Sequence, residues 1–250
     1  WLGGLDVFKS QARSIRYGTM RDNVRAIDAF LVDGSAMHFG EITSNEALAT
    51  LGERQALLAN KLLGMGRSED DAIRAGFPDV MRRVGGYNVD ALLPGGSPKG
   101  DWGNGLVNRK QLHPNLAHLL VGSEGTLGFS TEILLDLKPL PKEKVLGICH
   151  FPTFYAAMDS TQHIVKLGPA AVELVDRNMI ELARGIPIFK ETVDRFVKDK
   201  PDAILLAEFA GDNLDEQIRD LNSLVELMAD LGYPDGVVEA IDPNFQKDIW

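Results

Sequence analysis

The order of elements after residue 144 constrains the fold of this chain more than any other feature. Four short runs have the composition of strands, at Val145–Phe151, Ala171–Val175, Ala203–Phe209 and Gly236–Ile241. Residues with helical spacing lie between each run and the next. Strands and helices that alternate in this order predict an α+β fold, with a ferredoxin-like sandwich in the C-terminal part.

The helix expected between the last two of these runs carries the clearest signals. Asn213 followed by Glu216 is typical of a helix start, and Gly232 is typical of a helix stop. Apolar residues recur on one face of this helix, and we expect that face to lie in the core. They are Leu214, Ile218, Leu221, Val225, Met228 and Leu231.

The N-terminal part begins with a hairpin pattern. Ala26–Val32 and Ser35–Phe39 flank the pair Asp33-Gly34, which predicts two antiparallel strands joined by a tight turn. A further half-buried strand is predicted at Phe129–Leu137, where apolar residues fall on alternate positions. The two prolines and the charges of residues 139–144 then indicate a linker between two domains, at 1–142 and 143–250.

Helices and a long loop separate the hairpin from the later strand. Leucines at helical spacing predict a helix within about Ser44–Leu63, and Ser68 with Asp71 resembles a second helix start. Gly85–Asn108 is rich in glycine, proline and asparagine and is predicted to be a loop. Loops of that length usually carry function or lack order.

Composition limits the partners and the compartment. The formal net charge of -10 and the pI of about 5.0 oppose binding to a phosphate backbone, so no nucleic-acid partner is expected. No apolar run approaches the ~20 residues of a membrane span. The single cysteine, Cys149, lies in an apolar strand and is expected to be a buried hydrophobe. One cysteine favours a reducing, cytoplasmic location, and peripheral attachment to a membrane stays open.

The most informative short motif is the glycine-rich run Gly122–Gly128. Its three glycines are spaced three apart, so the backbone can approach a ligand closely and present N–H groups to it. A P-loop is excluded because no Gly-Lys-Ser/Thr follows, and a Rossmann turn is disfavoured because a strand follows. The pattern alone is equally compatible with a tight structural turn.

Four segments together resemble the FAD-linked oxidases related to D-lactate dehydrogenase, glycolate oxidase and D-2-hydroxyglutarate dehydrogenase. Leu119–Glu132 (LLVGSEGTLGFSTE) is similar to the glycine signature of that family. Arg16–Val24 (RYGTMRDNV) and Arg82–Asp90 (RRVGGYNVD) resemble two elements that precede this signature. Val172–Arg177 and Leu205–Phe209 resemble strands of the cap domain. The matches occur in the family order over almost the whole chain.

The resemblance implies both a fold and an activity. Residues 1–142 would be the second part of a PCMH-type FAD-binding domain with a helical insert at about 43–77, and residues 143–250 an incomplete cap domain. The family activity is oxidation of a D-2-hydroxyacid such as lactate, glycolate or 2-hydroxyglutarate by bound FAD. A separate electron acceptor, with an iron–sulfur module as a candidate, would reoxidise the flavin.

The resemblance also assigns candidate site residues. FAD contacts are expected from the glycine loop, and weaker ones from the segment before the hairpin, while the 85–108 loop offers weak candidates for a substrate or flavin role. In that order the residues are Gly122, Ser123, Glu124, Gly125 and Thr126; Gly18, Thr19 and Asn23; and Tyr87 and Asn88. The histidines show no metal-site spacing, so no metal is expected. They are His38, His113, His118, His150 and His163.

Several parts of the family pattern are missing from this sequence. The first flavin loop (R-G-x-G-T-S) and the later histidine stretch (H-G-D-G-N-x-H) do not occur, and Asp6–Gln11 replaces a Gly/Asn-rich turn. The start at Trp1 without a methionine and the end at Trp250 fit a piece of a longer protein. The main catalytic groups are therefore expected outside this chain. Two alternatives stay open: a folded but inactive fragment, and a flavin-free module that binds a partner.

Overall fold

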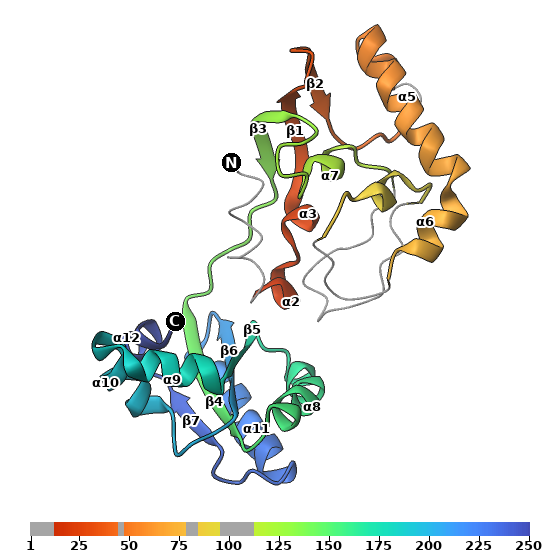
Figure 1. The fold of residues 1–250 in the computed structure, drawn as a ribbon. Coiled ribbons are helices and arrows are strands. Elements are labelled where there is room, and N and C mark those ends of the chain that lie inside the picture. The colour runs from red at the N-terminus through yellow and green to blue at the C-terminus, as the bar shows by residue number, and fades with distance from the viewer. Residues whose placement is uncertain (1–12, 45–47, 79–84, 96–112) are drawn as a thin grey trace. The chain divides into compact units, whose positions relative to one another are not determined.

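A computed structural model of the chain describes residues 13–44, 48–78, 85–95 and 113–250. The chain divides into two compact units, Trp1–Lys138 and Pro139–Trp250, which are treated separately below (Figure 1). Some sequence predictions concern residues outside the described ranges: the segment Asp6–Gln11, residues 45–47 of the first predicted helix, residues 82–84 of the third family motif, and residues 96–108 of the long loop.

The first unit is built on a three-stranded antiparallel sheet of order β2-β1-β3. Strands β1 (Val24–Phe30) and β2 (Ala36–Phe39) form the predicted hairpin. Its turn is held by Asp33, whose Oδ1 accepts a hydrogen bond from the Ser35 backbone N–H at 3.0 Å. Strand β3 (Phe129–Leu135) pairs with the other edge of β1, so segments about 100 residues apart lie side by side.

Strand β3 is more exposed than its alternating sequence predicts. Only Ile133 packs against the core of the unit, whereas Phe129 is 69 % exposed and Leu134 is 58 % exposed. The prediction of a half-buried strand was therefore wrong in degree, because alternation identifies two faces of a strand without showing what covers them.

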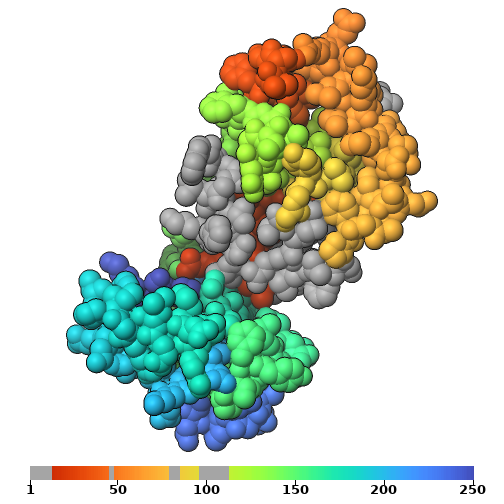
Figure 2. Space-filling view, viewed as in Figure 1, coloured from red at the N-terminus to blue at the C-terminus, as the bar shows by residue number. Residues whose placement is uncertain are grey.

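Helices cover the other parts of this first sheet. The short helices α2 (Ser14–Tyr17) and α3 (Met20–Asn23) precede β1, and α7 (Ala117–Leu120) precedes the glycine loop. The longest helix, α5 (Glu53–Ser68), packs against the 3-10 helix η1 (Val89–Leu92), and both contribute to the core of the unit. In Figures 1 and 2 α5 is drawn in orange along the surface of the unit.

The second helix of this segment begins later than predicted. Helix α6 runs over Asp70–Gly76, and its N-cap is Glu69, which makes no side-chain capping bond. Ser68 instead ends α5, where its hydroxyl donates to the Met65 carbonyl at 3.3 Å. The predicted helix start at Ser68 was therefore wrong, because a short bond to its own helix competes with capping of the next one.

The second unit has the predicted ferredoxin-like topology. Four antiparallel strands occur in the spatial order β5-β6-β4-β7, with bounds Ala171–Asp176, Ala203–Gly211, Glu143–Phe151 and Val237–Ala240. Helices α8 (Phe154–Ile164), extended by η2 (Val165–Leu167), and α11 (Leu214–Asp230) complete the βαββαβ order. The α+β fold class is confirmed.

Helices cover both faces of this second sheet. Alternate residues of β6 enter two separate cores: Leu205 and Phe209 face α8 and α11, and Ile204 and Leu206 face the opposite layer. That layer consists of α9 (Arg177–Gly185), α10 (Pro187–Phe196) and α12 (Pro243–Ile249). A strand buried on both faces is nearly all apolar, which explains the composition of residues 203–210.

The predicted limits of helix α11 are confirmed, but its predicted core face was partly wrong. The Asn213 side chain accepts hydrogen bonds from the N–H groups of Asp215 and Glu216, so it caps the helix as expected. Leu224, which was not in the predicted stripe, is fully buried, whereas Leu214 is 36 % exposed. The reason is a close approach to β4, where a Cβ at Gly147 would meet a Leu224 methyl group at 2.4 Å.

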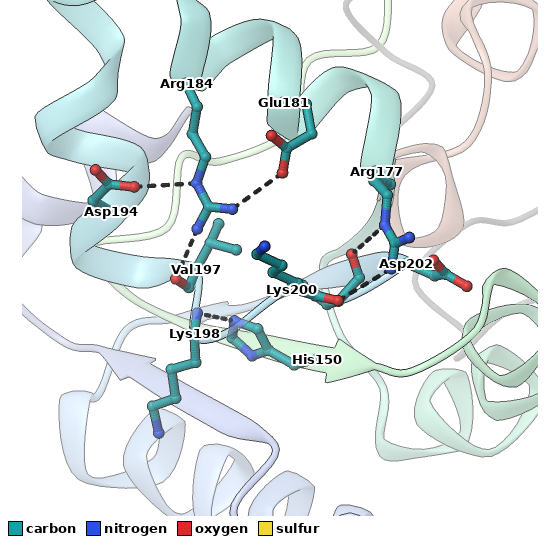
Figure 3. Close-up of polar contacts among 10 residues, drawn as sticks. His150, Arg177, Glu181, Arg184, Asp194, Val197, Lys198, Lys200 and Asp202 are labelled. Atoms are coloured by element: carbon teal, nitrogen blue, oxygen red, sulfur yellow. Dashed lines mark hydrogen bonds and ion pairs between the residues drawn. The ribbon is translucent and has the colours of Figure 1, made fainter.

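His150 joins three parts of the second unit. Its Nδ1 lies 3.0 Å from the Gly236 carbonyl oxygen, and its Nε2 accepts the Lys198 backbone N–H at 3.1 Å (Figure 3). A carbonyl only accepts, so this pair of contacts fits the neutral ring with its proton on Nδ1. Nε2 also lies 3.0 Å from the Phe196 carbonyl oxygen. A ring that is protonated on Nε2 would donate to this oxygen instead of accepting from Lys198. Burial, aided by the charge of Lys198, lowers the pKa of His150.

This geometry predicts that acid destabilises the second unit. Below the ordinary histidine pKa of about 6.5 the unfolded chain binds a proton before folded His150 does, so stability falls as the pH drops toward the lowered folded pKa. We expect the melting temperature of the unit, measured by calorimetry, to fall between about pH 7.5 and about pH 5.5. His150→Gln should flatten this dependence and His163→Gln should leave it intact. Equal slopes in both variants would contradict the assignment.

Candidate functional site

The glycine-rich run forms a compact turn between α7 and β3. Gly122, Glu124 and Gly125 adopt left-handed backbone angles, with φ of 77°, 53° and 78°. The turn is closed by the Ser123 N–H, which donates to Leu120, and by the Thr126 N–H, which donates to Ser123 at 3.0 Å. Within the described residues, the N–H groups of Glu124 and Gly125 donate no hydrogen bond, and both residues are exposed. They are available to a ligand.

Tyr87 and Asn88 lie directly against this turn. The Tyr87 hydroxyl is 2.8 Å from the Thr126 hydroxyl oxygen. The Asn88 side-chain amide donates two hydrogen bonds of 2.9 Å, to the carbonyls of His118 and Val121 on either side of the start of the loop. The structure therefore brings together the residues predicted from two motifs that are 33 or more positions apart.

A buried ion pair supports Asn88 from the opposite side. Arg21 Nη1 donates to both carboxylate oxygens of Asp90, at 3.0 and 2.8 Å, and to Asn88 Oδ1 at 3.3 Å. Arg21 and Asp90 are 6 % and 3 % exposed. Sequence reasoning placed both residues inside family motifs but assigned neither of them a role, because no local pattern pairs charges 69 residues apart.

The remaining predicted contacts lie on both sides of α3: Gly18 and Thr19 precede the helix, and Asn23 is its last residue. The Asp22 carboxylate accepts from both the backbone N–H and the hydroxyl of Thr19, at 2.8 Å each. The Asn23 amide donates to the carbonyls of Tyr17 and Thr19 at 2.9 Å. These bonds are local, so the structure gives no direct contact between these three residues and the glycine loop.

Some buried polar atoms near this region make no hydrogen bond. Arg21 Nε and Nη2 and Asn23 Oδ1 are shielded from solvent and have no hydrogen-bond partner among the residues that the structure describes. Buried polar groups normally have one. The two arginine nitrogens can donate hydrogen bonds to an acceptor such as a phosphate or carbonyl oxygen, and the asparagine oxygen can accept one from a donor. A flavin nucleotide carries both kinds of group, so the residues present fit it.

Among the described residues, no group of three or more His, Cys, Asp and Glu side chains could hold a metal ion. No helix in the part of the chain that the structure describes is long and apolar enough to cross a membrane. Cys149 is fully buried, and burial raises the pKa of its thiol to about 12, so it is no nucleophile.

A groove that the sequence did not reveal lies between the β1–β2 hairpin and α5. Its volume is about 380 Å³, and it is separate from the glycine loop. Apolar side chains, among them Leu31, Met37 and Leu58, form most of its lining, with Arg54 and Lys61 also present. Arg54 is already paired with Asp33.

Comparison with known proteins shows which family this chain is similar to. Residues 140–250 match the model described as "FAD linked oxidases, C-terminal domain". The D-2-hydroxyglutarate dehydrogenase of Haemophilus influenzae is 27 % identical over 236 residues, which is 91 % of this chain and 22 % of that protein. The mitochondrial D-lactate dehydrogenase [cytochrome] of Arabidopsis thaliana is 30 % identical over 54 % of this chain and 23 % of that protein.

A solved structure extends the likeness in fold to both units. An alkyldihydroxyacetonephosphate synthase matches 95 % of this chain and 32 % of its own, with a TM-score of 0.51 and 15 % identity. At that identity the match concerns the fold alone. The family resemblance seen in the sequence motifs is thus confirmed, while the chain spans less than a quarter of the length of the curated relatives it matches.

The buried ion pair makes a test of the site architecture possible. Asp90→Ala would leave the guanidinium of Arg21 buried and uncompensated, which typically costs about 3–5 kcal/mol of unfolding free energy. The exposed pair Arg74–Asp70 on α6 is the matched control, where Asp70→Ala should cost about 0.5 kcal/mol or less. Urea unfolding of the two variants measures both values. Equal costs would show that the Arg21–Asp90 pair does not hold the first unit together.

Proposed function

We propose that this chain is the flavin-contacting and cap section of a FAD-dependent dehydrogenase that oxidises a D-2-hydroxyacid. The observation that carries the proposal is the Gly122–Thr126 turn, in which the N–H groups of Glu124 and Gly125 bond to none of the described residues, in a chain related to FAD-linked oxidases. D-2-hydroxyglutarate is the preferred substrate, because the relatives with that name align over 84–91 % of this chain, against 54–68 % for those named D-lactate dehydrogenase.

The residues of this chain would hold and orient the cofactor. The N–H groups of Glu124 and Gly125 would donate to its acceptor atoms, while Gly122, Ser123 and Thr126 keep the turn in shape. Gly18, Thr19 and Asn23 are weaker contacts in this proposal, and Tyr87, whose hydroxyl is bonded to that of Thr126, would contact either the flavin or the substrate. When bound, FAD supplies the acceptor for the hydride of the substrate α-carbon.

The remaining parts of the reaction lie outside these residues. No catalytic acid or base is assigned here, since the groups that touch the substrate are expected elsewhere in the protein. A separate electron acceptor, with an iron–sulfur module as one candidate, would complete the cycle. The competing proposal is a flavin-free binding module that uses the sheet of the second unit. The structure does not favour that use, because helices cover both faces of this sheet.

Titration of the purified chain with FAD tests the cofactor assignment. We expect saturable one-to-one binding in the micromolar range, seen as quenched flavin fluorescence and a shifted visible spectrum. Gly125→Ala should weaken it by roughly 10-fold, because a side chain at this positive φ strains the turn by ~1–2 kcal/mol. Gly232→Ala, a change at another positive-φ glycine in the second unit, is the matched control and should bind FAD normally.

The outcomes separate the competing functions. A cooperative melt without any FAD binding would identify a folded fragment or a flavin-free module. With FAD bound, D-2-hydroxyglutarate, D-lactate and glycolate are then added separately while the flavin spectrum is recorded. A spectral change with D-2-hydroxyglutarate alone supports the substrate assignment, and a response to another acid in its place would reassign it.

A further inference from the structure

The loop that presents the free N–H groups has little support of its own. Its closing hydrogen bonds, from Ser123 to Leu120 and from Thr126 to Ser123, each span three residues. Gly122 and Gly125 adopt their left-handed angles without strain, but Glu124 is also left-handed, and a non-glycine residue keeps that geometry only when its surroundings fix it. Support must therefore come from other segments of the first unit.

Asn88 supplies that support through its side-chain amide. One of the two carbonyls it binds belongs to His118, within α7, and the other to Val121, the residue directly before the loop. Both bonds measure 2.9 Å, and Asn88 is 7 % exposed, so water does not compete for them. These two hydrogen bonds set the direction in which the chain leaves α7.

Arg21 fixes the orientation of this amide. An asparagine side chain can rotate to exchange its oxygen and nitrogen, and only one orientation directs the nitrogen to the two carbonyls. Arg21 Nη1 donates to Asn88 Oδ1, and a donor at that point selects the orientation with the nitrogen toward the loop. Asp90 in turn holds the guanidinium in place through both of its carboxylate oxygens.

We propose that Arg21, held in place by Asp90, is a positioning residue for the cofactor loop and acts through Asn88 on the carbonyls of His118 and Val121. This inference rests on the proposed function and deepens it, because it separates Asn88 from the ligand contacts. The side-chain polar atoms of Asn88 bind other groups of the protein. Of Tyr87 and Asn88, only Tyr87 would then face a ligand. The network sets the shape of the loop before the cofactor arrives.

Asn88→Asp tests this relay with the smallest change in shape. The substitution keeps an acceptor for Arg21 but replaces the donor that faces the two carbonyls with an oxygen. Asn60→Asp on α5 is the matched control, because the Asn60 amide makes a single local bond to the Ala56 carbonyl and is exposed. Hydrogen exchange of residues 121–128 reports the loop directly, and the second unit serves as an internal reference.

We expect Asn88→Asp to lower the protection of the loop amides and to weaken FAD binding by roughly 10-fold or more, as for loss of buried hydrogen bonds. The second unit should keep its protection, and Asn60→Asp should change neither quantity. Arg21→Lys keeps the charge but has a shorter side chain that ends in a compact, strongly hydrated ammonium group, so it should hold Asn88 less firmly and lower loop protection to a smaller extent. In the double variant the two effects should not add, because both act on one path.

The exchange measurement decides the inference even if the proposed function fails. If the unsubstituted chain binds no FAD, the cofactor assignment is overturned. The hydrogen-exchange data for the loop then decide the inference by themselves. Unchanged loop protection in Asn88→Asp would overturn the inference, whatever the affinity for FAD. If Asn88→Asp loses protection throughout the first unit, Arg21→Lys carries the decision. Additive effects on FAD affinity would also overturn the relay.

Discussion

A buried charge that must be neutralised governs the arrangement of the first unit. Arg21 lies in a helix of four residues, and a helix that short has almost no stability of its own. Placing its guanidinium away from water is tolerable only with a partner, and Asp90 provides one from a segment 69 residues away. Because hydrogen bonds restrict geometry more tightly than apolar contacts do, the pair selects one arrangement of the segments around it. The two family motifs and the glycine loop are held in that arrangement.

The second unit depends on a different principle, and for that reason its sequence was easier to interpret. Strand β6 is covered on both faces, and long periodic helices follow the strands, so the pattern of apolar residues carries most of the fold. The buried face of helix α10 and the whole of helix α12 were not predicted. In α10 the many charges of residues 190–195 hide the buried Val193 and Phe196, and α12 has only seven residues. Short elements whose packing depends on a neighbouring layer give no clear periodicity.

The candidate site was predictable in its position but not in its internal structure. Glycine spacing and family motifs indicated the Gly122–Gly128 turn, and the left-handed angles of its residues explain why glycines occur there. The link between Asn88 and the turn, and between Arg21 and Asn88, depends on side chains brought together by tertiary folding. Local sequence rules describe neighbours up to about four residues apart on a helix, so they cannot pair such distant groups. The same limit explains why the exposure of β3 was misjudged.

The position of Cys149 has a practical consequence. It is the single cysteine of the chain, lies in the doubly covered sheet, and is protected both by burial and by a thiol that stays protonated at neutral pH. The single cysteine of the folded chain therefore does not react with thiol-directed labels. A cysteine introduced at an exposed position, for example on α5 or α9, can carry a fluorophore or spin label without removal of the native one. Distances between the two units then become measurable in solution.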